Sequence, residues 1–244
     1  LILVAAGIYA YSIFKTVMGS EKITGNQGNI PEKGTELPPL TTGSSDWPNW
    51  RGKLFDGKSS LKGIYIDWST GLEKIWEVDY LCQGQSTATW AAPVIQGNRL
   101  IVPGRDENND LVFCLNSENG QLIWKGSYHA IAGTSHGPGP RATPFIDNDR
   151  VYTFGRSGDL VCWDLLDGTK HWYTNVKSEG GQEPDWGLSS SPLVLDDKVY
   201  VQGGGDALVC AFDKMNGKLA WKSLQGPSGY AAIVPFISDS TRLI

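Results

Sequence analysis

The sequence predicts an all-β fold, a β-propeller of four-stranded blades of which this chain holds a partial ring. The first observation is an eleven-residue stretch that occurs three times, at residues 114–124, 162–172 and 211–221. The second is a series of tryptophans at spacings of 48, 48 and 49 residues: Trp76, Trp124, Trp172 and Trp221. The third is a series of prolines, each followed 11 residues later by a glycine: Pro93, Pro144 and Pro192. Four short strands in a unit of about 40–50 residues are typical of a propeller blade.

The repeated stretch has the pattern of a β-hairpin. An Asn or Asp stands four residues before a glycine, and a Trp stands four residues after that glycine. The residue directly before the glycine is Asn119, Asp167 or Asn216. An Asn-Gly or Asp-Gly pair between apolar runs favours a tight turn, because both residues readily take positive φ. We therefore expect a strand, a tight turn with positive φ at both residues, and a strand that carries the Trp.

Each proline of the series opens a unit of four predicted strands. A short apolar strand follows the proline, then a polar turn, then a second strand that ends at the glycine. A third strand leads into the repeated stretch, and no segment between Trp76 and Trp221 has apolar residues at helical spacing. We expect three complete blades, at residues 85–126, 137–175 and 187–224.

Packing between blades explains the recurring tryptophans. Blades stack face to face around an axis, and no blade buries both of its faces alone. A large ring on the last strand covers the neighbouring blade and buries about 150–250 Å². We therefore assign a structural docking role to the whole series, Trp76, Trp124, Trp172 and Trp221.

Partial blades flank the three complete ones. Residues 64–76 form a degenerate copy of the repeated stretch, so we expect Ile75–Tyr80 to be the outer strand of the blade that closes the ring. Residues 235–237 and 242–244 echo a first and a second strand, which predicts the beginning of a fourth blade. A ring of 4–8 blades does not close from three, so the sequence predicts a fragment of a larger ring.

Residues 1–19 are expected to be a signal peptide or a membrane anchor. Residues 1–14 are apolar apart from Ser12 and two tyrosines, and Lys15 follows. A spanning helix needs about 20 apolar residues and the apolar region of a secretory signal fewer, so both alternatives stay open. A buried core helix is disfavoured, because residues 20–45, rich in Gly, Pro, Thr, Ser and Asn, predict a flexible linker directly after it. Both alternatives place residues 46–244 outside the cytoplasm.

The repeated stretch resembles the tryptophan-docking repeat of the pyrroloquinoline quinone (PQQ) propellers, on the pattern Ala211-x-Asp-x-x-Asn-Gly-Lys-x-x-Trp221. Residues 46–52, 139–144 and 186–192 resemble those of secreted bacterial PQQ-like, or quinoprotein-dehydrogenase-like, repeat proteins. The propeller lipoprotein of outer-membrane β-barrel assembly is a relative of that group. The likeness covers residues 46–244. It specifies the fold strongly and the function weakly, because the superfamily mixes enzymes with scaffolds.

The resemblance implies two kinds of function. A quinoprotein-type oxidoreductase uses PQQ and calcium, and such enzymes resemble one another in a vicinal cysteine pair, a calcium site and a catalytic aspartate. Here no two cysteines are adjacent, so we name no catalytic residue and no metal ligand. We favour an extracytoplasmic, membrane-tethered scaffold for binding or assembly, and an enzyme whose catalytic loops lie outside this sequence is a third alternative.

The cysteines and histidines suit structural roles better than a metal site. Cys114, Cys162 and Cys210 are expected to be buried thiols, with a disulfide through Cys82 or a metal site as alternatives. His129 and His136 lie in a Gly-rich loop, where a solvated or hydrogen-bonded histidine is more common than a ligand. The acidic runs 105–110 and 179–185 are expected to be solvated loops.

The loops that enter the first strands are expected to rim the axial funnel and to hold a ligand site. This site contains Trp90, Arg141, Trp186 and Tyr230. One Arg among aromatic side chains suits an anionic or planar ligand, through bidentate hydrogen bonds and stacking. The alternative is that Arg141 pairs with backbone carbonyls and the aromatic rings plug the funnel. The partner is thus a protein or a small ligand and not nucleic acid, because the net charge is −5 and no basic cluster is present.

Overall fold

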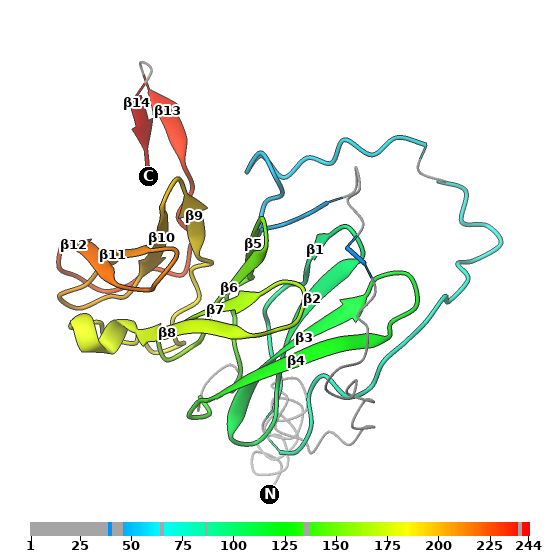
Figure 1. The fold of residues 1–244 in the computed structure, drawn as a ribbon, viewed down its shortest axis with the longest axis horizontal. Coiled ribbons are helices and arrows are strands. Elements are labelled where there is room, and N and C mark those ends of the chain that lie inside the picture. Colours follow the sequence, from blue (N-terminus) through cyan, green and yellow to red (C-terminus); the bar gives the residue numbers. More distant parts are fainter. Residues whose placement is uncertain (1–38, 41–45, 64–65, 86, 134–136, 239–240) are drawn as a thin grey trace, which may run out of the picture.

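The computed structural model describes residues 39–40, 46–63, 66–85, 87–133, 137–238 and 241–244 (Figure 1). These residues form three four-stranded antiparallel sheets and one two-stranded sheet. The helical structure in this part of the chain is one short 3-10 helix, η1 (Val176–Glu179). None of the helical structure in the described ranges has the length and apolar character needed to span a bilayer.

The three large sheets are propeller blades, so the predicted fold class is confirmed. In each blade, hydrogen-bonded neighbours follow the order of the chain. The first blade consists of β1 (Val94–Gln96), β2 (Arg99–Arg105), β3 (Asn109–Asn116) and β4 (Leu122–His129). The second consists of β5 (Phe145–Asp147), β6 (Arg150–Phe154), β7 (Asp159–Asp164) and β8 (Lys170–Asn175). The third consists of β9 (Leu193–Leu195), β10 (Lys198–Gln202), β11 (Val209–Asp213) and β12 (Leu219–Ser223).

A separate hairpin of β13 (Phe236–Ser238) and β14 (Thr241–Leu243) follows the third blade. Strand β1 contacts β5 and β5 contacts β9, so the first strands of the three blades are neighbours. Figure 1 shows the three sheets fanned out from these first strands, with the β13–β14 hairpin beyond the third blade. The loops that enter the first strands therefore lie together at one end of the blades.

The repeated stretch forms the expected hairpin, but the predicted turn is wrong. Gly120 has a φ of +71°, whereas Asn119 is not among the residues with positive φ. The amide of Gly120 donates to the carbonyl of Asn116 at 2.8 Å, and the amide of Asn116 donates to Gln121 at 2.8 Å. The loop is thus one helix-like turn that ends at a left-handed glycine.

The Asx residue at the beginning of the loop explains this geometry. The side chain of Asn116 accepts a hydrogen bond from the amide of Glu118 at 2.8 Å. Asp164 and Asp213 make the same bond to the amides of Leu166 and Met215. Such a bond stabilises a local turn, so the Asn or Asp four residues before the glycine determines the turn.

The predicted outer strand Ile75–Tyr80 is not a strand. None of the ladders in the described ranges includes it. Trp76, Val78 and Tyr80 of this segment instead pack on the open face of the first blade, against a cluster that includes Leu111 and Phe113. Without a neighbouring strand its backbone has no ladder to join, and side-chain packing together with the hydrogen bond from Trp76 to Ser117 holds it in place.

The hydrophobic core lies between blades. One cluster joins β6 and β7 of the second blade to β10 and β11 of the third, and it includes Tyr152, Cys162, Val199 and Phe212. A second cluster joins the first and second blades and includes Ile101, Cys114 and Trp163. Each blade thus buries one face against the next, as repeat architectures require.

Residues 46–57 form a strap across the first strands. The amide and carbonyl of Trp47 bond to those of Ile95 in β1 at 2.9 and 3.0 Å. The carbonyl of Pro48 accepts from Ile146 in β5 at 2.7 Å. The strap therefore ties the first blade to the second.

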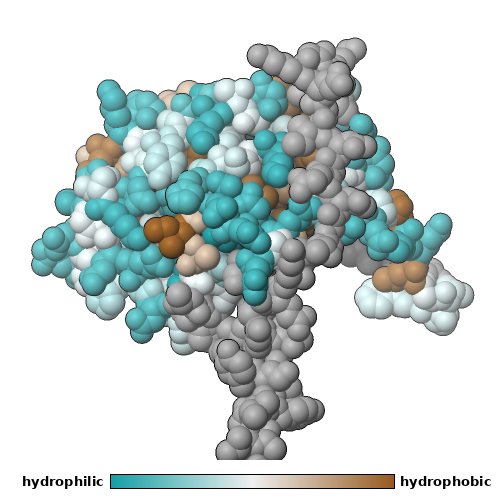
Figure 2. Space-filling view, turned by 90° about the horizontal axis from the view of Figure 1, so that it is seen from below, coloured by the Kyte–Doolittle hydropathy of each residue, from teal (hydrophilic) through white to brown (hydrophobic). Residues whose placement is uncertain are grey.

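The predicted membrane segment, residues 1–19, lies outside the described residues, and so does most of the predicted linker. Of the linker, Pro39 accepts a hydrogen bond from the side chain of Asn98 at 2.9 Å, and Leu40 packs against the core of the first two blades. Figure 2 shows one face of the molecule, which is mostly hydrophilic with small separate hydrophobic areas.

Candidate functional site

The four residues predicted for the rim lie on loops that enter successive first strands. Trp90 precedes β1, Arg141 precedes β5, Trp186 precedes β9 and Tyr230 precedes β13. Backbone bonds join the first two of these loops, because the amide of Trp90 donates to the carbonyl of Pro140 at 3.0 Å.

Trp90, Gly137 and Arg141 form one packed unit. The Nη2 of Arg141 donates to the carbonyl of Gly137 at 3.1 Å. Gly137 has a φ of +88°, and a Cβ there would lie 2.2 Å from Nε1 of Trp90. Only glycine allows the loop to lie this close to the indole ring. The predicted alternative, a backbone carbonyl as partner of Arg141, is therefore present in the structure.

Trp186 and Tyr230 stack on each other. Their ring centroids are 5.1 Å apart and the ring planes differ by 29°. Both side chains remain accessible, with 47% and 43% of their surfaces exposed, and Trp90 is 52% exposed. Three exposed rings on one rim are available for contact with another molecule.

Arg156 belongs to this site and was missed in the sequence. It is buried, and its Nη1 donates to the carbonyl of Trp186 at 2.9 Å. Its Nε lies 3.2 Å from the carboxylate of Glu183. A Cβ at Gly187 would lie 2.3 Å from its Cγ, so the loop wraps closely around the arginine. Arg156 thus fixes the position of Trp186.

Arg105 has the equivalent place in the first blade. Its Nη1 lies 2.6 Å from the carboxylate of Asp110, and its Nη2 donates to the carbonyl of Ala130 at 2.8 Å. The sequence did contain a signal for these two arginines. In two of the three blades an arginine directly follows the glycine at the end of the predicted second strand, at Gly104-Arg105 and Gly155-Arg156. The third blade has Gly204 at this place, so the signal occurs only twice.

Arg141 and Arg156 are two like charges on the rim. Burial lowers the pKa of Arg141, and the charge of Arg156 lowers it further, while Tyr230 opposes the shift. Two guanidinium groups close enough to repel each other are stabilised by an anion placed beside them. Glu183 supplies one carboxylate, which also bonds to Lys177 at 3.1 Å.

A polar network lies between the first and second blades, below the rim. Asp110 lies in a run that was expected to be a solvated loop, but it is buried, because the ion pair with Arg105 draws it inward. Burial raises the pKa of Asp110 to about 6, against the opposing charge of Arg105. Tyr128 donates to Asp110 at 3.3 Å, and the charge of Asp159 adds to the rise.

Trp124 and Trp172 lie between blades, and Trp76 lies on the open face of the first blade. The Nε1 of Trp124 donates to the carbonyl of Leu165 at 2.9 Å, and that of Trp172 donates to Lys214 at 3.0 Å. Trp76 makes the same bond to Ser117 of the first blade at 3.1 Å. Each of these three rings covers the turn glycine of the next blade, where a Cβ would lie 2.6 Å from the ring: Gly120, Gly168 and Gly217.

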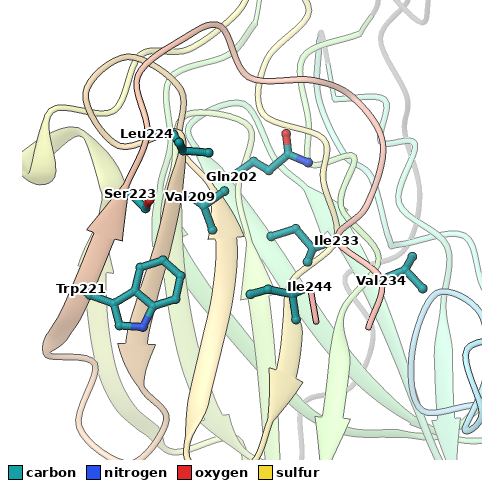
Figure 3. A pocket seen from close by; sticks show the side chains of 8 residues that line it. All are labelled: Gln202, Val209, Trp221, Ser223, Leu224, Ile233, Val234 and Ile244. Atoms are coloured by element: carbon teal, nitrogen blue, oxygen red, sulfur yellow. The ribbon is translucent and has the colours of Figure 1, made fainter. Parts of the chain in front are cut away.

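Trp221 is the exception in this series, because 38% of its surface is exposed. It lines a pocket of about 390 Å³ together with Val209, Ile233 and Val234. Figure 3 shows Trp221 and Val209 on one side of this pocket, with Ile233, Val234 and Ile244 on the other. This apolar pocket lies on the open face of the third blade.

The cysteines do not form a reactive site. All four are free thiols, and Cys114, Cys162 and Cys210 are buried. Burial raises the pKa of Cys114 to about 12, so its thiol stays protonated. Within the described ranges, no three His, Cys, Asp or Glu side chains lie close enough to hold a metal ion, and His136 lies outside those ranges.

Comparison with known proteins places the chain in a family. A family model described as outer membrane protein assembly factor BamB matches residues 108–244. BamB of Shewanella oneidensis is 24% identical over 188 residues, which covers 73% of this chain and 43% of that protein. This chain therefore spans less than half the length of that relative.

One solved structure shares the fold. The quinohemoprotein alcohol dehydrogenase of Comamonas testosteroni has a TM-score of 0.55 and 18% identity, over 73% of this chain and 27% of the enzyme. BamB of Moraxella catarrhalis has a TM-score of 0.40 and 21% identity, over 55% of this chain and 36% of that one. The first likeness shows a common fold alone, and the family model matches more than half of the chain. The chain therefore belongs to the family of PQQ-type β-propeller repeats described as outer membrane protein assembly factor BamB.

Proposed function

We propose that this chain is an extracytoplasmic scaffold of the BamB type, which binds a protein partner and serves the assembly of outer-membrane proteins. The family match over residues 108–244 carries this proposal. Residues 1–19 would secrete the chain or anchor it to a membrane, residues 20–45 would act as the tether, and residues 46–244 would form the propeller part.

The rim is the binding surface in this proposal. Trp90, Trp186 and Tyr230 are exposed aromatic side chains, and aromatic residues and arginine are enriched at protein interfaces. Their loops are held in place by backbone bonds and by Arg156, so partner binding costs little ordering of the rim.

The second candidate is a quinoprotein-type oxidoreductase with PQQ and calcium. PQQ is a planar tricarboxylate, so its site needs several cationic or polar groups and a coordinated cation. On the described rim, Arg156 already pairs with Glu183 and with the carbonyl of Trp186, and Arg141 already donates to the carbonyl of Gly137. The stacked face of Trp186 is already covered by Tyr230. These residues do not fit the cofactor, and we derive no catalytic step from it.

Gene deletion tests the proposed function. We expect loss of the gene to lower the amount of folded outer-membrane proteins, and the full-length gene to restore it. Complementation with Trp186→Ala or Arg141→Gln should restore it only in part. Trp50→Ala and Arg51→Gln are matched controls, because the exposed Trp50 and the half-buried Arg51 lie together on the strap, with the guanidinium 5.5 Å from the ring centroid.

Two outcomes would contradict the proposal. Normal outer-membrane protein levels without the gene would exclude an assembly role. Stoichiometric binding of PQQ and calcium by the full-length protein, with dye-linked oxidation of alcohols that Arg141→Ala abolishes, would establish the oxidoreductase instead.

A further inference from the structure

We propose that a cleft beneath the strap binds a free apolar α-amino acid. The carboxylate of the ligand would lie at Lys53 and Asn49, its ammonium group at Asp46, and its side chain on Phe55 and Phe145. This site is separate from the rim, so the inference goes beyond the proposed function. Four features of the cleft support it: its size and fixed walls, a buried amide group, two opposite charges and an apolar floor.

The cleft lies between the strap and the first strands of the blades. Its volume is about 300 Å³, and its walls come from the strap and from β1, β5 and β9. Gln96 ends β1 and Asp147 ends β5, so the cleft lies toward the opposite end of these strands from the rim. Sites for small molecules occupy about 300–1,000 Å³. The cleft is at the lower end of this range and therefore suits a ligand about as large as one amino acid.

Hydrogen bonds hold the strap in place over the cleft. The Oδ1 of Asp46 accepts from the amide of Gly97 at 2.7 Å. The carbonyl of Pro48 accepts from Ile146, so the strap lies beside β5 (Figure 1). The walls of the cleft are thus formed before any ligand binds, which lowers the cost of ordering on binding.

Asn49 supplies a hydrogen-bond donor at the cleft. Its side chain lines the cleft but is only 4% exposed, and its Oδ1 accepts from the amide of Arg51 at 3.2 Å. Its Nδ2 has no hydrogen-bond partner in the part of the chain that the structure describes. A buried donor without a partner is costly, so an acceptor on a ligand would be favourable here. A carboxylate oxygen is such an acceptor.

One charge of each sign is available in the cleft. Asp147 also lines it, but its carboxylate already bonds to Nζ of Lys214 at 2.7 Å. Among the described residues, Asp46 and Lys53 take part in no ion pair, although both line the cleft. A ligand with one ammonium group and one carboxylate complements both charges, and an α-amino acid carries the two groups on one carbon.

An apolar floor accepts the side chain of the ligand. The rings of Phe55 and Phe145 have centroids 6.1 Å apart, and Val194 lines the same cleft. Phe55 has a φ of +58°, which is rare for a bulky residue and strains the backbone. Such strain is concentrated at ligand-binding and catalytic sites. The floor therefore favours an apolar or aromatic side chain.

Isothermal titration of the full-length protein tests this inference. The probe is L-phenylalanine. L-Phenylalaninamide lacks the carboxylate, N-acetyl-L-phenylalanine lacks the ammonium group, and glycine lacks the side chain. We expect L-phenylalanine to bind at least about tenfold more tightly than either blocked form, because each form loses a charge-assisted hydrogen bond. Glycine should not bind measurably, because it buries no apolar side chain.

Variants assign the binding to the cleft. Lys53→Gln should weaken L-phenylalanine about tenfold and leave L-phenylalaninamide unchanged. Asp46→Asn should weaken L-phenylalanine similarly and leave N-acetyl-L-phenylalanine unchanged, while asparagine keeps an oxygen for the amide of Gly97. Lys58→Gln and Asp56→Asn are matched controls and should change nothing. Asp56 also accepts from a backbone amide, that of Lys58 at 2.9 Å, but neither residue lines the cleft.

Four outcomes would overturn the inference. Equal affinity for L-phenylalanine and L-phenylalaninamide would exclude the carboxylate contact. Equal weakening by Lys53→Gln and Lys58→Gln would show unspecific charge attraction. Tighter binding of acetyl-Gly-Gly-Phe than of L-phenylalanine would assign the cleft to a peptide C-terminus instead of a free amino acid. Absence of L-phenylalanine binding, both by titration and by a shift in melting temperature, would exclude the site. The assembly role is tested separately by gene deletion.

Discussion

Trp172 and Trp221 hold the same place in successive blades, yet their surroundings differ. Trp172 lies between the second and third blades, 8% exposed, and covers the turn glycine Gly217. Trp221 lies on the open face of the third blade, 38% exposed, beside an apolar pocket. The strand and the turn are the same in both places, so the burial of the ring comes from the neighbouring blade.

The difference shows that each copy of the repeated stretch takes part in two interfaces, one with the preceding blade and one with the following blade. Its glycine and its loop carbonyl receive the ring from the preceding blade, and its own Trp covers the following blade. Stability in this chain is therefore carried by contacts between neighbouring blades, as in other repeat proteins. The predictions below test the closed interfaces against the open face.

The largest expected difference is between two alanine substitutions. Trp172→Ala should lower the free energy of unfolding by about 3–5 kcal/mol, because a buried ring and its bond to Lys214 are lost. Trp221→Ala should cost about 1 kcal/mol, because less of its surface is removed from water. Urea unfolding of both variants measures this. Equal losses would show that the open face is as well packed as the closed interface.

A pH-dependent difference is expected at the interface of the first and second blades. The pKa of Asp110 is about 6 in the folded chain and near 4 in the unfolded chain. Between these values the folded state binds the extra proton, so the contribution of Asp110 to stability is largest below about pH 4 and is lost as the pH rises to about 6. The loss amounts to at most about 3 kcal/mol, from 1.36 kcal/mol per pKa unit.

Urea unfolding of the chain and of Asp110→Asn, at several pH values, checks this prediction. The difference in stability between the two proteins should change between pH 4 and 6 and stay constant above pH 7. The absolute stability of Asp110→Asn is not the readout, since that variant also alters the buried partner Arg105. A constant difference across the window would show that Asp110 titrates normally.

Alanine variants of two glycines with similar backbone conformations distinguish the cost of a clash with a docked tryptophan from the cost of backbone strain. Gly168 has a φ of +74° and Gly71 a φ of +80°, but a Cβ at Gly168 would lie 2.6 Å from Trp124, whereas a Cβ at Gly71 meets nothing within 4 Å. Both alanine variants strain the backbone by about 1–2 kcal/mol. Gly168→Ala should lose about 1–3 kcal/mol more, through overpacking against the ring. Similar thermal midpoints for the two variants would contradict the docking role.

The smallest expected effect concerns an ion pair that joins the second and third blades. Lys214 lies 2.7 Å from Asp147, and both side chains are mostly buried. Lys214→Met should cost about 0.5–1 kcal/mol at low salt and less at high salt. The pair Lys198–Asp197 has the same distance but lies within one blade, with the Asp197 side chain 75% exposed, so Lys198→Met should change stability too little to measure. A larger effect of Lys198→Met would contradict this ranking.

Much of the fold was predictable from the sequence because the repeat is local. Each hairpin depends on an Asx residue, a glycine and an apolar run that lie within eleven residues. The turn geometry was mispredicted because an Asn-Gly pair suggests a two-residue turn, while the Asx side chain four residues earlier forms the loop. The strand at Ile75–Tyr80 was mispredicted because a ladder needs a neighbouring strand, which the local sequence does not contain.

The site was predictable in part. The aromatic residues and Arg141 stand out at the entrances of the first strands, but Arg156 lies in the connection between β6 and β7. Its role depends on a contact with Trp186, 30 residues later, which a local pattern does not show. The repeated Gly-Arg pair was the available signal, and its absence from the third blade weakened it.

The strap has a consequence for the order of folding. Its bonds join Trp47 to Ile95 and Pro48 to Ile146, across 48 and 98 residues of chain, whereas each hairpin closes a loop of a few residues. Long loops close at a greater entropic cost, so the hairpins form first and the strap pairs last. During synthesis or export from the N-terminus, the strap emerges about 100 residues before its second partner. A chaperone that covers Trp47 and Trp50 during this interval would protect the newly made chain from aggregation.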